Sequence, residues 1–140
     1  MPGKALVVDA NILVRAVLGK RVRELIETHC DAVSFFVSEA AYAEAEHHLP
    51  LLVARRGGDP NKALTFLRAL SQLVELMGLD SYRDFETDAR ERLRLRDPDD
   101  WHTLAAALAL RCPIWTEDTD FFGCGVATWT SDRVQVFLRD

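Results

Sequence analysis

Short apolar runs and longer amphipathic stretches alternate from one end of the chain to the other. The first run, at 5–8, contains only Ala, Leu and Val, which is typical of a strand buried on both faces of a parallel sheet. Similar runs predict strands at 33–37, 113–116 and 126–130. The run at 74–77 could instead continue the helix before it, but we favour a further strand there.

The stretches between these runs place apolar residues at helical spacing. They predict helices over 10–19, 22–30, 39–56, 60–70, 82–94 and from 101 onward, with a closing helical turn that reaches 138. Serine side chains can cap three of the starts, at Ser38, Ser81 and Ser131. Pro50 has no N–H, so it should kink or divide the helix after Ser38. The charged helix at 82–94 has a thin buried stripe of Phe85, Ala89 and Leu93.

Strands that alternate with helices are joined by right-handed crossovers and pair in parallel. We therefore predict a three-layer α/β/α domain around a mostly parallel sheet. A chain of 140 residues has the size of one domain with one sizeable core. We expect a single domain that spans residues 1–140.

The composition is that of a folded globular protein, since 49% of the residues are hydrophobic and 28% are charged. The net charge of −5 argues against a generally basic nucleic-acid coat. Cys30, Cys112 and Cys124 form no C-x-x-C pair, so neither a disulfide framework nor a structural zinc site is indicated. The sequence also shows no signal peptide and no membrane-spanning run, and we expect a cytoplasmic protein with reduced thiols.

Four acidic residues from distant parts of the chain are expected to meet at one edge of the predicted sheet. Asp9 directly follows the first strand, and Asp118 comes two residues after the strand that ends at Thr116. Asp100 begins the helix that leads into that strand, and Glu44 lies one to two turns into the helix after the second strand. Open parallel sheets bind ligands outside the carboxyl ends of their strands, where the strand order reverses. These four acids are therefore our candidate site residues.

Carboxylates that converge in this way need a cation or bound protons. Two unit charges about 4 Å apart repel by roughly 4 kcal/mol at an effective dielectric constant of about 20. Ligands that are all oxygen atoms favour Mg²⁺ or Mn²⁺ over zinc. One such ion, or two, would acidify water and stabilise the attacking and leaving oxygens of a phosphodiester. The sequence therefore predicts a divalent-metal site that hydrolyses phosphates.

Four short segments, in this order and spacing, resemble the PIN-domain nucleases, several of which are the toxin halves of bacterial toxin–antitoxin pairs. The segments are VVDANIL, VSEAAYAEAE, DPDDWHTLAAALAL and WTEDTDFF, and the resemblance spans nearly the whole chain. It implies a four- or five-stranded parallel sheet and a Mg²⁺- or Mn²⁺-dependent ribonuclease. Such proteins are usually dimeric, so the resemblance implies a homodimer. It also implies an RNA substrate and a possible antitoxin partner.

Carried onto this sequence, the metal-binding acids of the family fall on Asp9, Glu44, Asp100 and Asp118. The resemblance implies supporting roles for Asn11, Thr116 and Asp120. Asp97 resembles an additional acid that some members have. The helix that contains Glu44 offers two more acids that could take its place if the segment is aligned differently, Glu39 and Glu46.

Each of these acids also has a purely structural interpretation. Asp97, which is followed by a proline, is a good helix cap, and Asp100 could complete a capping box. Asp118 and Asp120 could form turns by bonding their own backbone. Asp9 is harder to explain in this way, because a carboxylate after four apolar strand residues is partly desolvated and needs a partner. Structural roles alone do not account for all the acids at once.

Three other patterns favour structural explanations. Glu44, His47 and His48 form E-x-x-H-H, but a carboxylate-bridged di-iron site needs a second copy of that motif, and none is present. Three tryptophans with apolar neighbours are better explained by core packing than by base stacking: Trp101, Trp115 and Trp129. Every second residue of one short stretch is an arginine: Arg90, Arg92, Arg94 and Arg96. This pattern is most often a solvated helix face, but it could also bind a phosphate backbone.

Two other functions compete with the nuclease. Aspartyl-phosphate receivers and phosphatases resemble this pattern, but they need a lysine late in the chain, and none follows Lys62. Asn11 also stands where a D-x-D phosphatase motif has its second aspartate. The other alternative is a catalytically inactive PIN-fold binding module. The sequence alone does not distinguish that module from the enzyme.

Overall fold

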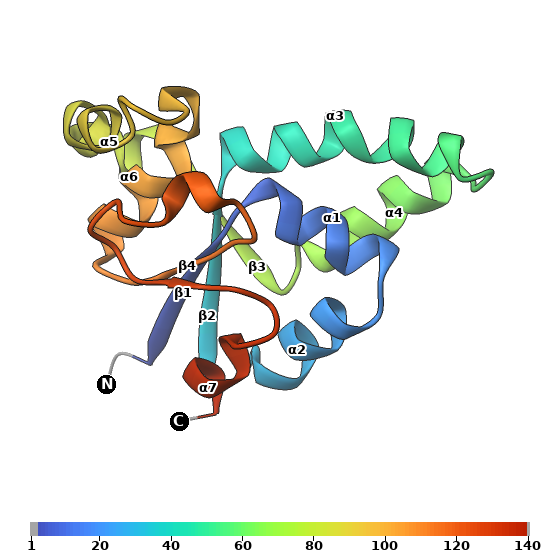
Figure 1. Cartoon of the computed structure of the whole chain (residues 1–140). Helices are drawn as coiled ribbons and strands as arrows, with labels where there is room; N and C mark the ends of the chain where they lie inside the picture. The colour runs from blue at the N-terminus through green and yellow to red at the C-terminus, as the bar shows by residue number, and fades with distance from the viewer. Residues whose placement is uncertain (1–2, 140) are drawn as a thin grey trace.

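The computed structural model describes residues 3–139. Within them, five parallel strands form one sheet in the order β3-β2-β1-β4-β5 (Figure 1). The strands are β1 (Lys4–Val8), β2 (Val33–Ser38), β3 (Val74–Met77), β4 (Ile114–Trp115) and β5 (Thr128–Trp129). All the predicted strands are present, including the one at 74–77, although β4 and β5 are shorter than the predicted runs.

Seven α-helices occur in the same part of the chain. They are α1 (Ala10–Leu18), α2 (Arg21–His29), α3 (Glu39–Arg55), α4 (Pro60–Leu70), α5 (Glu86–Arg92), α6 (Trp101–Leu110) and α7 (Val134–Leu138). Short 3-10 turns add η1 (Leu79–Ser81), η2 (Arg83–Phe85), η3 (Pro98–Asp100) and η4 (Thr119–Phe121). No helix within residues 3–139 is both long enough and apolar enough to cross a membrane.

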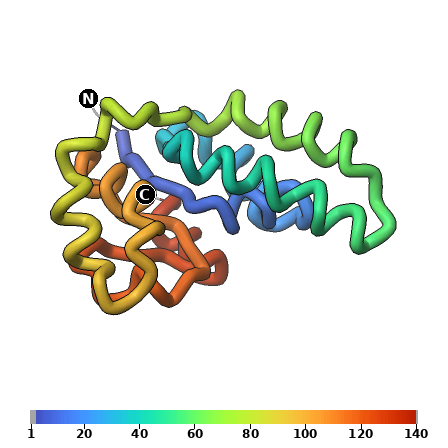
Figure 2. The backbone as a smooth tube through the Cα atoms, turned by 90° about the horizontal axis from the view of Figure 1, so that it is seen from above, coloured from blue at the N-terminus to red at the C-terminus, as the bar shows by residue number. Residues whose placement is uncertain are grey.

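The helices cover both faces of the sheet. Successive residues of a strand point to opposite faces, so Leu6 and Val8 pack with α1–α4 and α7, whereas Val7 packs with α5 and α6. Figure 1 shows these two groups of helices on opposite sides of the sheet. In Figure 2, α3 and α4 lie side by side and extend away from it. The predicted three-layer α/β/α fold is confirmed.

The strand order reverses at β1. The chain passes from β1 outward through β2 to β3, and then returns to place β4 on the other side of β1. β1 and β4 pair in parallel, and the Asp9 N–H donates to the carbonyl oxygen of Trp115 at 3.3 Å. The carboxyl ends of these two strands therefore lie next to each other, which is the position expected for a ligand site.

Pro50 does not divide the helix that follows Ser38, because α3 runs through it from Glu39 to Arg55. Leu49 and Val53, on either side of it, are buried in the core, and this packing holds both halves of the helix together. The Glu46 carbonyl, which lacks its usual N–H partner because Pro50 has none, belongs to an exposed residue where water can replace it.

Two predicted helix starts also moved. The charged helix starts at Glu86 rather than near Tyr82, after two 3-10 turns, and Phe85 is 36% exposed rather than buried. Ser131 does not cap a helix, since α7 starts at Val134. Its hydroxyl oxygen instead accepts a hydrogen bond from the Trp115 indole N–H at 3.0 Å. A buried indole donor needs a partner, and tertiary packing brought Ser131 to it.

Candidate metal centre

A small pocket opens at the carboxyl ends of β1 and β4. All four candidate acids line it: Asp9, Glu44, Asp100 and Asp118. Its volume is about 50 Å³, whereas pockets for drug-sized ligands measure roughly 300 Å³ or more. The pocket therefore suits an ion with a few waters rather than an organic cofactor.

Asp9 is the buried acid of this pocket, with 6% of its surface exposed. It caps α1, because its Oδ1 accepts the Ile12 N–H at 3.0 Å, and its Oδ2 accepts a hydrogen bond from the Thr116 hydroxyl. Burial raises the pKa of the Asp9 carboxyl to about 6; these two hydrogen bonds oppose the rise, and the charges of Asp118 and Glu44 add to it. A nearby cation would favour the charged form.

Thr116 connects two of the acids. Its hydroxyl donates to Asp9, and the same oxygen accepts the backbone N–H of Asp118 at 2.9 Å. The Asp118 Oδ1 in turn accepts the Asp120 N–H at 2.9 Å, so Asp118 does form a turn, as the structural interpretation predicted. That bond leaves the second carboxylate oxygen of Asp118 without a hydrogen bond within the described residues. A turn former and a metal ligand are thus compatible roles here.

Asp100 lies where η3 meets α6. Asp97 caps this turn, because its Oδ1 accepts the Asp99 N–H at 3.1 Å. The Asp100 side chain makes no capping hydrogen bond, so the capping-box interpretation is wrong and its carboxylate is available for a ligand. Burial, and then the charge of Asp97 and of the other acids nearby, raise the pKa of the Asp100 carboxyl to about 7.

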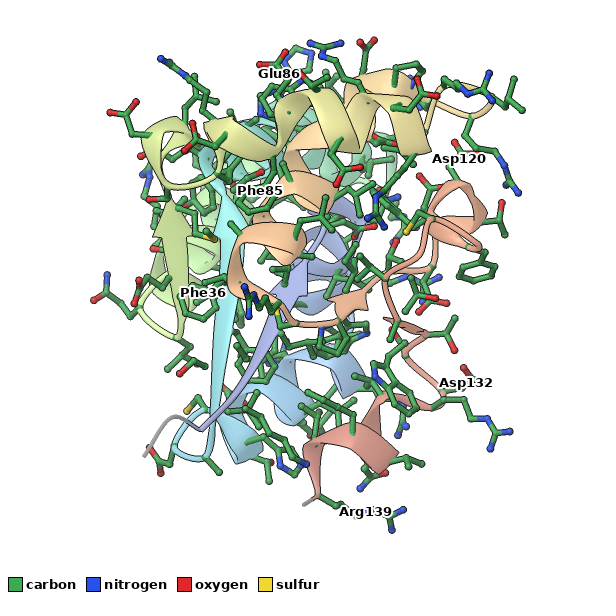
Figure 3. All side chains as sticks on the ribbon, turned by 90° about the vertical axis from the view of Figure 1, so that its left-hand side faces the viewer. Phe36, Phe85, Glu86, Asp120, Asp132 and Arg139 are labelled. Atoms are coloured by element: carbon green, nitrogen blue, oxygen red, sulfur yellow. The ribbon has the colours of Figure 1, made fainter. Side chains whose placement is uncertain are left out.

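A second acidic group adjoins the pocket. Asp97, Asp100 and Asp120 each contribute a carboxylate oxygen, and these oxygens lie within 4.8 Å of one another. No other group of three or more His, Cys, Asp or Glu side chains in residues 3–139 is as closely spaced. Figure 3 shows Asp120 on the loop beside α5. Because Asp100 belongs to both groups, the pocket and this rim form one acidic surface.

Helix α3 carries three glutamates, of which one lines the pocket. Glu44 lines the pocket, and so does Asn11, the first of the residues given a supporting role. The Glu39 carboxylate lies close to Gly78, at the end of β3, and Glu46 does not line the pocket. The geometry therefore selects Glu44 among the three glutamates of this helix.

His102 is a pocket-lining residue that the sequence analysis did not identify as part of the site. The buried Tyr82 hydroxyl lies 2.8 Å from its Nδ1. Burial raises the pKa of the Tyr82 hydroxyl and lowers the pKa of the His102 imidazole. This hydrogen bond holds the His102 ring at the edge of the pocket, and the imidazole tautomer sets which of the two groups donates. The only sequence signal was the place of His102 two residues after Asp100.

The arginines at 90–96 are not a free basic strip. Three of them form ion pairs with acids of the same segment: Arg90 with Glu86, Arg92 with Asp88, and Arg94 with Glu91. The solvated-face interpretation therefore describes them better than a phosphate track. The tryptophans pack as predicted, since Trp101 and Trp115 are buried and Trp129 is partly buried against Phe137.

A family model described as "PIN domain" matches residues 7–139 of this chain. The chain belongs to the PIN domain family. This finding confirms the resemblance that the four sequence segments indicated. No curated protein matched in a search of such proteins.

Solved structures share the PIN fold at low sequence identity. VapBC2 from Rickettsia felis, bound to a DNA fragment from its promoter, is similar with a TM-score of 0.71 at 13% identity, over 90% of this chain and 98% of that one. FitAcB from Neisseria gonorrhoeae has a TM-score of 0.64 at 18% identity, over 90% of this chain and 97% of that one. PAE2754 from Pyrobaculum aerophilum has a TM-score of 0.71 at 17% identity, over 97% of this chain and 90% of that one. At these identities the likeness establishes the fold.

Proposed function

We propose that this PIN-domain protein is an endoribonuclease that requires Mg²⁺ or Mn²⁺ and is the toxin of a toxin–antitoxin pair. The main support is the convergence of Asp9, Glu44, Asp100 and Asp118 on one small pocket at the strand-order reversal. Asp97 and Asp120 extend this pocket at its rim. The proposed ligands of the ion are the four pocket acids.

The donor chemistry of the pocket fits a hard divalent cation. All the proposed ligands are carboxylate oxygens, which Mg²⁺ and Mn²⁺ prefer. Burial, and after it the charges of neighbouring acids, raise the pKa values of Asp9 and Asp100, and a bound cation would favour their charged forms. Within residues 3–139, carboxylates line the pocket with a single histidine, His102, and no cysteine, so its donors favour a hard cation over zinc.

The residues of the chain have separate tasks in this proposal. Thr116 holds the Asp9 carboxylate in place and fixes the backbone at Asp118. Asp100, which has no capping hydrogen bond, presents a free carboxylate at the start of α6. When bound, the ion would polarise the phosphodiester and make water a better nucleophile. His102 would offer its Nε2 to a substrate at the edge of the pocket, with its Nδ1 held by Tyr82.

The partners form part of the same proposal. Among the solved structures of this fold, one is a toxin–antitoxin complex from Klebsiella pneumoniae, similar with a TM-score of 0.62 at 17% identity. We extend that association to this chain and infer an antitoxin partner. The RNA substrate is proposed from the resemblance to the PIN-domain nucleases. We also propose a homodimer. Light scattering of the purified protein should then give about twice the chain mass of 15.8 kDa.

Cleavage of labelled RNA with Mg²⁺ or Mn²⁺, with and without EDTA, tests the activity. Asp9→Asn and Asp118→Asn should each abolish cleavage, because each removes a charged ligand from the pocket. The matched control is Asp31→Asn, at an exposed position before β2, which should leave the rate unchanged. Cleavage that persists in both pocket variants would refute the proposed site. Metal binding without cleavage of any RNA would favour the inactive binding module instead.

A further inference from the structure

The loop between β4 and β5 bears two of the acids, Asp118 and Asp120, and two arginines from outside the loop hold its backbone. The Arg92 Nη1 donates to the carbonyl oxygen of Cys124 at 3.0 Å. The Arg96 Nη1 donates to the carbonyl oxygen of Thr119, between the two acids, at 3.1 Å. Figure 3 shows this loop, marked by Asp120, beside α5. The segment at 92–96 is therefore bonded to the loop near its start and near its end.

Arg92 is held in place for this contact. Its Nε donates to the Asp88 Oδ1 at 2.9 Å, one helical turn earlier in α5. With one side of the guanidinium fixed by Asp88, the other side faces the loop. The planar fork of an arginine can make both bonds at once, which a lysine ammonium on a flexible stem cannot reproduce with the same geometry.

Gly125 makes the close approach possible. It has a φ of +91°, and a Cβ at this position would overlap the Arg92 Nη1, so any side chain there would displace the guanidinium. Gly123, in the same loop, also has a positive φ of +84°, but a Cβ there would meet nothing within 4 Å. Only the glycine at 125 is thus needed for the arginine contact.

We propose that Arg92 and Arg96 are positioning residues that hold Asp118 and Asp120 in place for a divalent cation. This inference rests on the proposed function. Acids that face other acids repel one another, so their loop would otherwise move outward. Both arginines bond to backbone carbonyls rather than to the carboxylates of the site. They therefore fix the loop and leave the acids free to bind the ion.

The affinity for Mn²⁺, measured by calorimetry, distinguishes a positioning role of each arginine from the effect of its positive charge on a nearby cation. Loss of a positive charge near the site would tighten cation binding, whereas loss of a bond that holds the ligands would weaken it. Arg92→Ala and Arg96→Ala should each weaken Mn²⁺ binding by about tenfold, the lower end for residues that support metal ligands. The matched control is Arg94→Ala, which loses the same charge but only an exposed pair with Glu91. It should leave the affinity unchanged or tighter.

The two glycines give an independent test. Gly125→Ala should weaken Mn²⁺ binding as Arg92→Ala does, whereas Gly123→Ala, with similar backbone strain, should not. Gly125→Ala should weaken Mn²⁺ binding less in the Arg92→Ala variant than in the wild type, because that variant already lacks the contact between Arg92 and the loop. Amide hydrogen exchange of residues 118–125 in the metal-free protein should be faster in Arg92→Ala than in Arg94→Ala. Arg92→Lys, which keeps the charge, should resemble Arg92→Ala.

Equal Mn²⁺ affinities and equal exchange rates for Arg92→Ala and Arg94→Ala would overturn the inference. If Arg92→Ala fails to fold, the comparison of Gly125→Ala with Gly123→Ala decides it in the same way. A wild-type protein that binds no Mn²⁺ would refute the proposed function itself. The two failures are therefore distinguishable.

Discussion

At the scale of single residues, the site depends on Thr116 as much as on its acids. One hydroxyl group donates to Asp9 and accepts from the Asp118 N–H, so it determines the spacing of two proposed ligands. Thr116 is fully buried, and water cannot replace its bonds. Asp9 itself tolerates a change to asparagine better, since the amide oxygen can still accept the Ile12 N–H.

Thr116→Val should destabilise the metal-free protein by about 1–3 kcal/mol, the cost of leaving a buried donor or acceptor without a partner. It should also weaken Mn²⁺ binding, because Asp9 and Asp118 lose their common support. Urea unfolding and calorimetry measure the two effects. Thr116→Ser, which keeps the hydroxyl, is the control for the bonds. A valine variant as stable as the serine variant would show that the Thr116 hydroxyl bonds contribute little.

At the scale of elements, α3 remains one helix although Pro50 removes one of its backbone hydrogen bonds. Leu49 and Val53 are buried on the same helix, and they keep the two halves aligned despite the missing N–H at Pro50. The helix needs to be continuous, because its first turns bring Glu44 to the pocket and its last turns pack beside α4.

Pro50→Ala should therefore stabilise the fold. Proline inside a helix is about 3 kcal/mol less favourable than alanine, and the greater freedom of the unfolded alanine chain removes part of that gain. We expect a net gain of about 1–2 kcal/mol in the free energy of unfolding, measured with urea. RNA cleavage should be unchanged, because Pro50 does not line the acidic pocket. Destabilisation would mean that the proline ring itself packs in the core.

At the scale of the whole molecule, the acidic pocket links stability to pH and to metal. The pKa values of Asp9 and Asp100, about 6 and about 7, lie above the ordinary value of 3.8, so both acids bind protons more tightly in the fold than in the unfolded chain. This stabilisation is complete below the unfolded pKa and is lost as the pH rises through the folded values. For the buried Asp9 the loss amounts to about 3 kcal/mol.

The metal-free protein should accordingly become less stable between about pH 4 and pH 8. Saturating Mg²⁺ should stabilise it much more at pH 8 than at pH 5, because the ion binds the folded protein with ionised acids. Thermal unfolding across this range, with Mg²⁺ or with EDTA, checks both effects. Asp9→Asn should flatten the metal-free profile, since it removes one of the two titrating groups. A flat wild-type profile would contradict the prediction.

Local sequence patterns were enough to predict the strands, the parallel layers and three of the pocket acids, Asp9, Asp100 and Asp118. Apolar runs favour buried strands wherever they occur, and a carboxylate at the end of such a run must lie at one known edge of a parallel sheet. The sequence failed where a residue had several possible partners. Ser131 has the same capping chemistry as Ser38, but only Ser38 caps a helix. Ser131 lies three residues before the start of α7, and its hydroxyl accepts the Trp115 indole N–H instead.

By itself, then, the sequence determined the α/β architecture and which acids lie near the carboxyl ends of β1 and β4. Both follow from local periodicity and from chain order. Only the tertiary structure decided that Glu44 rather than Glu39 or Glu46 faces the pocket, that His102 lines it, and that Arg92 approaches Gly125. These contacts join side chains far apart along the chain, and their geometry is set by how the packed helices are rotated and placed, which no local pattern specifies.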